Sequence, residues 1–109
     1  MSERAHPIRA MLRMKVKPGA EDAFVEAWTR VAAAASGVEG NLRQSLLRDH
    51  EDPRTFVVCT DWASRAAFGA FERSPEQDQL TAPLRELRES ATMSIFELVE
   101  HVDGGVRLS

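Results

Sequence analysis

The sequence predicts an α+β fold in which helices cover one face of a four-stranded antiparallel sheet. Three observations lead to this expectation. Polar and apolar residues alternate from Pro7 to Lys17, as in a half-buried strand. Apolar residues then recur at helical spacing from Ala20 to Ser36. Two further strand-like stretches, 41–48 and 55–62, flank a short polar turn and predict an antiparallel hairpin.

The first strand has one apolar face and one largely basic face. Because side chains alternate across a strand, the apolar set is expected to face the helices. Lys17-Pro18-Gly19 follows as a turn, in which proline suits the first central position and glycine the second. The apolar face consists of Ile8, Ala10, Leu12, Met14 and Val16.

The first helix begins with negative charge and continues with an apolar stripe. Glu21 and Asp22 favour the helix N-terminus electrostatically. Trp28 lies in the stripe at helical spacing, which assigns it to the core. Gly37 is positioned to end the helix in a left-handed conformation.

Trp62 ends the third strand and is followed directly by a helical stretch. An aromatic side chain at a strand-to-helix corner lies where α+β folds open pockets, and an indole offers a ligand an apolar ring and one N–H donor. Trp62 is therefore the first candidate for a functional side chain. The alternative is that Trp62 only fills the space between sheet and helix.

Two helices and a last strand complete the chain. Phe68 and Phe71 are expected to face inward from the first of these helices. Ser74-Pro75-Glu76-Gln77 combines a capping serine with proline at the first helical position, which predicts the start of the second. Pro83 is expected to kink that helix or divide it. Apolar residues on both faces predict a strand from Ala91 to Val102.

The resulting element order is the split βαβ arrangement of ferredoxin-like folds, βαββαβ. Its helices cover only one face of the sheet. The other face still carries apolar side chains, and their exposure would leave a larger patch than a monomer normally tolerates. We therefore expect a two-fold homodimer in which two sheets form a shared α/β barrel. The domain is expected to span residues 7–102, with flexible ends at 1–6 and 103–109.

Composition argues against several classes of protein. The 109 residues suit one domain, and the net charge of −3 does not favour a nucleic-acid partner. No apolar run approaches the roughly 20 residues of a membrane span. The single cysteine, Cys59, forms no internal disulfide and the N-terminus has no signal-peptide pattern, so a cytoplasmic protein is expected. His50 has no second histidine or cysteine at ligand spacing, so no metal site is expected.

Three segments carry a resemblance to a known family: residues 14–28, Gly40-Asn-Leu with Leu46-Leu-Arg-Asp49, and residues 56–68 around Thr60-Asp-Trp62. Over roughly residues 8–100 they resemble the antibiotic biosynthesis monooxygenase family of dimeric α+β barrels. Members from aromatic polyketide pathways oxidise anthrone-like substrates to quinones without flavin, haem or metal. The resemblance therefore implies a cofactor-independent oxygenase with dioxygen as co-substrate, and a pocket between sheet and helices.

The resemblance also implies site residues. Trp62 matches a tryptophan with a catalytic or substrate-contacting role in the polyketide members. At other family positions this chain differs. Leu12 and Val58 stand where relatives have asparagines, Phe68 stands where some have a tyrosine, and Thr81 lies near the position of a helix arginine that they use. Fewer donors then remain to stabilise a developing anion. The candidate catalytic residues are Trp62 and His101, the latter as proton acceptor, and the candidate substrate-binding residues are Leu12, Met14, Val58, Phe68, Phe71 and Thr81.

Three functions stay open at this level. The first is a cofactor-free oxygenase acting on an aromatic polyketide or a related phenolic or quinone compound in secondary metabolism. The second is a non-oxidative cyclase or chaperone of such a pathway, which the apolar replacements fit because they help to exclude water. The third is a dimer that binds small molecules, or serves only as a scaffold, without turnover.

Overall fold

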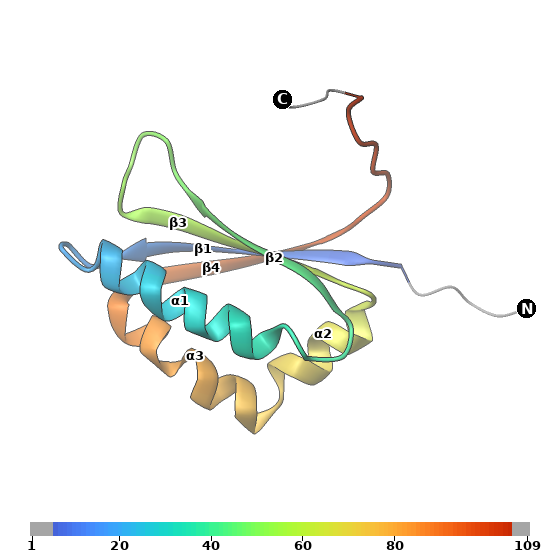
Figure 1. Ribbon diagram of the computed structural model, residues 1–109, viewed down its shortest axis with the longest axis horizontal. Coiled ribbons are helices and arrows are strands. Elements are labelled where there is room, and N and C mark those ends of the chain that lie inside the picture. The colour runs from blue at the N-terminus through green and yellow to red at the C-terminus, as the bar shows by residue number, and fades with distance from the viewer. Residues whose placement is uncertain (1–5, 106–109) are drawn as a thin grey trace, which may run out of the picture.

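The computed structural model describes residues 6–105. Its four strands form one antiparallel sheet in the order β2-β3-β1-β4, and the helices lie on one side of this sheet (Figure 1). The predicted ferredoxin-like α+β fold is confirmed. Of the expected flexible ends, residues 1–5 and 106–109 lie outside the described residues. The elements are β1 (Ile8–Val16), α1 (Glu21–Ala35), β2 (Asn41–Arg48), β3 (Thr55–Trp62), α2 (Arg65–Glu72), α3 (Pro75–Leu87) and β4 (Arg88–Glu97).

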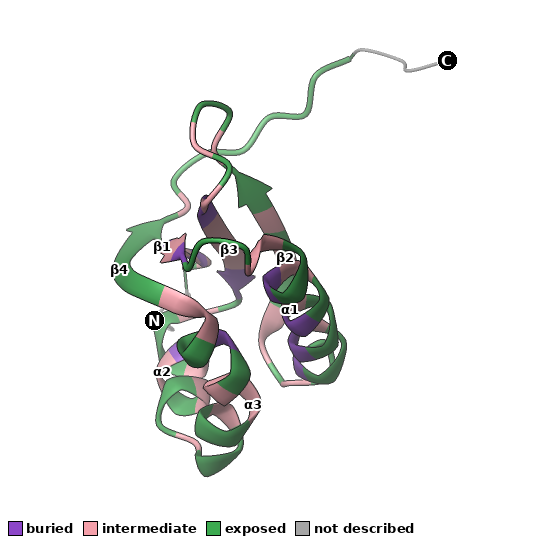
Figure 2. Cartoon of the chain, turned by 90° about the vertical axis from the view of Figure 1, so that its left-hand side faces the viewer, coloured by how far each residue is buried: buried purple, intermediate pink, exposed green. Residues whose placement is uncertain are grey.

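The core lies between the sheet and the helices, where Figure 2 shows the buried residues. Two clusters make up this layer. The larger is centred on Phe24 of α1 and Phe56 of β3, whose ring centroids lie 5.2 Å apart. The smaller packs Trp62 against Phe68 of α2 and the start of β1. The apolar face of β1 thus supplies both clusters, as its alternating pattern predicts.

Several local predictions are confirmed. Gly19 has a φ of 81°, and Ala20 N donates to Lys17 O across the turn at 3.0 Å. The Ser74 hydroxyl accepts a hydrogen bond from Gln77 N at 3.1 Å, with Pro75 as the first residue of α3. Ser64 caps α2 in the same way, by accepting from Ala67 N at 3.1 Å. Side-chain caps of this kind satisfy N–H groups that a helix leaves free at its start.

The predicted left-handed glycine after α1 is wrong: within residues 6–105, Gly40 and not Gly37 has a positive φ at this end of the helix. The reason is that α1 is capped from elsewhere. The carbonyl of Ala35 accepts hydrogen bonds from Val38 N and from Asn41 Nδ2, each at 3.0 Å. Since these donors satisfy the terminal carbonyl, no glycine cap is required there.

The last strand is shifted relative to its prediction of Ala91–Val102. β4 begins at Arg88 because Val16 already pairs with it and Lys17 N donates to Leu87 O at 2.9 Å. Pairing along β1 ends where Leu98 N donates to Pro7 O at 2.9 Å, so residues after Leu98 leave the sheet. Pro83 does not divide α3, which runs from Pro75 to Leu87 as one helix.

The face of the sheet opposite the helices, here called the open face, mixes apolar and charged side chains. Paired residues of neighbouring strands point to the same side, so Met11, Cys59 and Ser45 lie in one row across it. Leu47 and Phe96 are about half exposed nearby. Asp61, with only 3% of its side chain exposed, lies in the same face. None of the helices between residues 6 and 105 is long and apolar enough to cross a membrane.

Candidate active site

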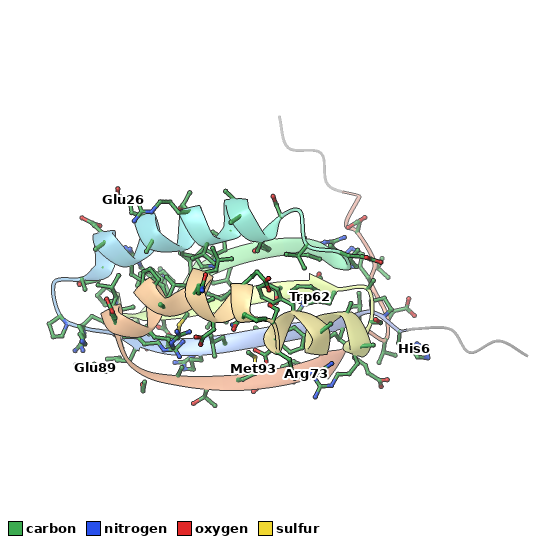
Figure 3. The ribbon with its side chains drawn as sticks, turned by 90° about the horizontal axis from the view of Figure 1, so that it is seen from below. His6, Glu26, Trp62, Arg73, Glu89 and Met93 are labelled. Carbon is green, nitrogen blue, oxygen red and sulfur yellow. The ribbon has the colours of Figure 1, made fainter. Side chains whose placement is uncertain are left out.

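A cavity of ≈ 110 Å³ lies between the sheet and the three helices. Its floor contains an apolar row, because the register pairs Leu12 with Val58 on one side and with Met93 on the other. Helices α1, α2 and α3 supply the remaining walls. Seen from the helix side, Trp62 lies between α1 and the other two helices, and Met93 lies on β4 (Figure 3).

The structure brings together all but one of the residues that the sequence marks as candidates. Lining the cavity are Leu12, Met14, Val58, Trp62, Phe68, Phe71 and Thr81. His101 does not line it. It follows β4, is exposed, and its Nε2 lies 2.8 Å from Asp103 Oδ1. The geometry therefore gives no support to His101 as the group that takes a proton from a ligand in this cavity.

Trp62 is held by three contacts and is only 1% exposed. Its ring stacks on Phe71 at a centroid distance of 5.2 Å and is tilted against Phe68 at 5.7 Å. Its indole Nε1 donates to Thr60 Oγ1 at 3.0 Å. The indole N–H, which we expected to be available to a ligand, thus already donates to Thr60 within the protein. Trp62 therefore contributes its apolar ring to the cavity wall.

Polar side chains line one part of the cavity wall. Gln44 Nε2 donates to Ala32 O at 2.9 Å and Asn41 Nδ2 to Ala35 O, so both amides tie β2 to α1. Glu72 and Gln77 also line the cavity, and their side chains form no hydrogen bond or ion pair with any residue of the described range. These two groups are therefore available to a ligand.

Two arginines contact the cavity wall from outside. Arg85 Nη1 donates to Thr81 Oγ1 at 2.6 Å, while Thr81 Oγ1 donates to Gln77 O at 2.9 Å. The guanidinium of Arg85 thus lies one helical turn after Thr81 and also pairs with Asp78 Oδ1 at 3.3 Å. Arg88 Nη1 lies 3.4 Å from the sulfur of Met14. Burial is the main reason that the pKa of Arg88 is lowered, with Arg85 adding repulsion.

The sequence reasoning missed Glu72, Gln77, Arg85 and Arg88 as parts of this site. A signal existed for Glu72 and Arg85, because residues four apart share one helix face: Phe68 precedes Glu72, and Thr81 precedes Arg85. For Arg88 there was none, since its approach to Met14 depends on how α3 meets β4.

Asp61 and Cys59 precede Trp62 in the sequence, but their side chains lie on the open face of the sheet. Asp61 accepts from Arg9 Nε at 2.7 Å and from Arg9 Nη2 at 3.0 Å, and these bonds are the main reason that its pKa is lowered. Burial raises the pKa of the Cys59 thiol. Neither group lines the cavity. Among residues 6–105, no three histidine, cysteine or acidic side chains cluster closely enough to hold a metal ion.

Comparisons with known proteins agree with this architecture. The family model described as antibiotic biosynthesis monooxygenase matches residues 7–82. A relative, the 42.8 kDa protein in the whiE locus of Streptomyces coelicolor, is 24% identical over 98 residues, which cover 90% of this chain. The match spans only 25% of that relative's length.

Solved structures show the same fold. SnoaB, a cofactor-independent oxygenase from Streptomyces nogalater, superposes with a TM-score of 0.81 at 23% identity, covering 92% of this chain and all of SnoaB (100%). PA3566 from Pseudomonas aeruginosa superposes with a TM-score of 0.76 at 15% identity, covering 91% of this chain and 100% of PA3566. At these identities the likeness concerns the fold.

Proposed function

The chain belongs to the antibiotic biosynthesis monooxygenase family, and we propose that it is a cofactor-independent monooxygenase acting on an aromatic polyketide or a related phenolic or quinone compound of secondary metabolism. Dioxygen is the co-substrate. The single observation that carries this proposal is the cavity itself, in which Trp62 presents a buried aromatic face beside apolar side chains. With a volume of ≈ 110 Å³, such a site fits one aromatic ring of a flat ligand and excludes water from it.

For this reaction the protein must favour the deprotonated, anionic form of the substrate. Triplet dioxygen reacts slowly with closed-shell organic compounds, but an electron-rich enolate or phenolate can transfer one electron to it. The resulting radical pair combines to a hydroperoxide, whose O–O bond breaks as the second C–H proton leaves. A methylene group and dioxygen thereby become a carbonyl group and water. The substrate supplies all the electrons that reduce the oxygen.

The positive groups at the wall suit this requirement. Arg88, beside Met14, and Arg85, which donates to Thr81 and also pairs with Asp78 Oδ1 at 3.3 Å, add positive charge next to the cavity. Anion formation in a site of low polarity gains more from such charges than it does in water. Arg85 and Arg88 thus act as positioning residues that favour the deprotonated substrate.

Glu72 is the proposed proton acceptor, in place of His101. Glu72 borders the cavity, is exposed to solvent, and its carboxylate has no hydrogen-bonding partner among the described residues, so it can turn toward an acidic substrate proton. Gln77, with its side-chain amide similarly available, is placed to hold a ligand oxygen. Trp62, Leu12, Met14, Val58, Phe68, Phe71 and Thr81 form the remaining substrate contacts.

The active form is proposed to be a homodimer. The exposed positions on the open face and on the edge strand β4 include Leu47, Ile95 and Phe96. Every residue from Glu89 to Glu97 is exposed in the single chain. One edge of β4 pairs with β1, and its other edge pairs with no strand of the described residues. A second copy would cover both surfaces, which a soluble monomer rarely leaves bare.

Oxygen consumption tests the proposal. Purified protein with anthrone should consume one dioxygen per anthraquinone formed, faster than buffer alone. Trp62→Phe should lower the rate about tenfold or more, because the smaller ring no longer fills the wall against which the substrate packs. Phe56→Leu removes aromatic volume from the larger core cluster at a residue that does not line the cavity, and it should retain most of the rate. No acceleration by the wild-type chain over buffer would count against an oxygenase.

One observation favours a second function, that of a non-oxidative cyclase or chaperone. Leu12, Val58 and Phe68 make the cavity apolar, and the Trp62 N–H is satisfied by Thr60. A site with few free donors can hold and fold a reactive polyketide without stabilising a peroxide anion. Regioselective ring closure of a polyketide substrate under argon, without oxygen uptake in air, would identify this function.

A further inference from the structure

A second hollow lies next to the cavity. It is a solvent-open groove of ≈ 910 Å³ between the C-terminal end of α1, helix α2 and the first turns of α3. Figure 2 shows α1 standing apart from α2 and α3 on this side of the sheet. The groove is walled mainly by small or apolar side chains, which include Ala34, Val38, Ala66, Ala67, Ala70 and Leu80.

Phe71 is the one residue that lines both the groove and the cavity. Its ring stacks on Trp62 on the cavity side, at 5.2 Å and an interplanar angle of 30°. Unlike Trp62 and Phe68, which are 1% and 3% exposed, Phe71 is only partly buried. The side chain of Phe71 is therefore the partition between the two spaces.

The backbone of α2 is held around this partition. The carbonyl of Phe71 accepts hydrogen bonds from Ser74 N at 3.0 Å and from Ser74 Oγ at 2.7 Å. Because these bonds hold the backbone at the end of the helix, rotation of the Phe71 side chain is the movement that opens the partition without breaking them. Such a rotation requires only that the ring leave its stack on Trp62, and it involves no change of fold.

The cavity alone is too small for an extended ligand. Pockets that bind drug-sized molecules enclose about 300–1,000 Å³, whereas the cavity beside Trp62 has ≈ 110 Å³. The groove on the other side of Phe71 supplies the missing space. Two carboxylates, Glu39 and Glu76, border it, so a negatively charged ring substituent would be disfavoured there.

We propose that Phe71 determines how many rings the ligand has: when its side chain turns aside, the cavity and the groove become one site for an extended, uncharged polycyclic compound. One ring then lies against Trp62 and the others extend past α2 between α1 and α3. This inference rests on the proposed function, since it gives the substrate class of the same site. With Phe71 in the observed position, the cavity admits only a small ring.

The test compares two neutral probes, 1-naphthol with two fused rings and anthrone with three, under argon. Binding is followed by quenching of tryptophan fluorescence, because Trp28 and Trp62 both line the cavity. If the open rotamer is populated at about 10% or less, Phe71→Ala should raise the affinity for anthrone about tenfold while changing that for 1-naphthol much less. Phe71→Trp should shift the ratio of the two affinities in the opposite direction.

A matched control removes aromatic volume elsewhere. Phe56→Leu alters the larger core cluster, and Phe56 lines neither space, so it should leave the affinity ratio unchanged. A carboxylate on the outer ring should weaken binding, so anthraquinone-2-carboxylate should bind less tightly than anthraquinone. The difference between the two affinities should become smaller in high salt, because salt screens the repulsion by Glu39 and Glu76.

Equal changes for both probes in Phe71→Ala, or the same ratio in Phe71→Ala and wild type, would overturn the role of Phe71. If the wild-type chain still oxidises anthrone in that case, the proposed function stands and only this inference fails. Absence of saturable binding of either probe to wild type and to both Phe71 variants would overturn the two together.

Discussion

The indole N–H of Trp62 donates to the hydroxyl of Thr60, two residues earlier on β3, at 3.0 Å. Both side chains point to the helix-covered side of the sheet, as residues two apart on a strand must. Because Trp62 is 1% exposed, no solvent can replace this acceptor. The bond lets an indole be buried at the cavity without an unsatisfied donor.

Thr60→Val should therefore destabilise the protein by about 1–3 kcal/mol, since it keeps the shape of the side chain and removes the acceptor of a buried N–H. Thr60→Ser keeps the hydroxyl and should cost much less. Urea unfolding followed by tryptophan fluorescence measures both. Equal stability of the valine variant and wild type would mean that the Trp62 N–H finds another acceptor.

Position 40 requires glycine for two reasons: its backbone is in a left-handed conformation, and Ala67 lies too close for a side chain. Gly40 has a φ of 88°, and a Cβ at this position would stand 2.5 Å from the Cβ of Ala67 on α2. Gly40→Ala should lower the free energy of unfolding by about 2–4 kcal/mol, combining backbone strain with overpacking. Thermal unfolding should show a lower midpoint.

The control for this variant is Gly37→Ala, because Gly37 has an ordinary φ and no atom within 4 Å of the added methyl group. It should be neutral or slightly stabilising. Adding Ala67→Gly to Gly40→Ala removes the contact but not the strain, so it should restore part of the loss. A double variant no better than Gly40→Ala would assign the whole effect to φ.

The Arg9–Asp61 pair should make stability depend on pH. Hydrogen bonds from Arg9 are the largest cause of the lowered pKa of Asp61 in the folded chain. A carboxyl with a lowered folded pKa contributes stability above its unfolded pKa of about 4, and that contribution is lost as pH falls through the folded pKa. We expect unfolding midpoints in urea to fall below about pH 4, and less steeply in Asp61→Asn.

At pH 7 the same Asp61→Asn variant should be less stable by about 1–2 kcal/mol, because it weakens the charge-assisted hydrogen bonds to Arg9, which is itself partly exposed to solvent. The exposed pair of Glu26 with Arg30 provides the comparison, and Glu26→Gln should change stability by less than about 0.5 kcal/mol. A pH profile that is identical in wild type and Asp61→Asn would rule out this pair as its source.

Arg85 should affect turnover through the charge it places behind Thr81. Arg85→Gln should lower kcat for anthrone oxidation about tenfold with a smaller change in KM, since the charge is felt most when the substrate is an anion. The rate should also rise at higher pH than in wild type, because the bound substrate loses its proton less readily. Arg85→Lys should recover part of the rate.

The arginine on α1 serves as the control for that prediction. Arg30 is exposed and pairs only with Glu26 at 3.6 Å among the described residues, so Arg30→Gln should leave kcat and its pH profile unchanged. A loss in Arg85→Gln that comes with an unshifted pH profile would indicate a structural role for Arg85 instead.

Substitutions on the open face should change the state of association. Light scattering of the wild-type chain at micromolar concentration should give the mass of a dimer, and Phe96→Asp should give that of a monomer, because a charge there opposes burial. Val99→Asp is the control, since Val99 is 88% exposed beyond the end of β4. A wild-type mass equal to one chain would contradict the dimer.

Local patterns in the sequence determined the kind and order of the elements. The alternation from Ile8 to Val16, the stripe through Trp28, the turn at Gly19 and the serine at position 74 each depend on residues a few positions apart, where side-chain periodicity and hydrogen bonding act directly. The inward direction of Leu12 followed from the same periodicity, whereas Val58 became a candidate through the family resemblance and Trp62 through its place at the end of a strand.

Only the tertiary structure decided which groups meet. That Asn41 caps α1, that Gly40 lies against Ala67, that Arg85 reaches Thr81 and that His101 stands away from the cavity all depend on strand register and on helix position. Periodicity gives the direction of a side chain but not its distance from a segment remote in the sequence. The size of the cavity and the place of Phe71 beside the groove depend on those distances.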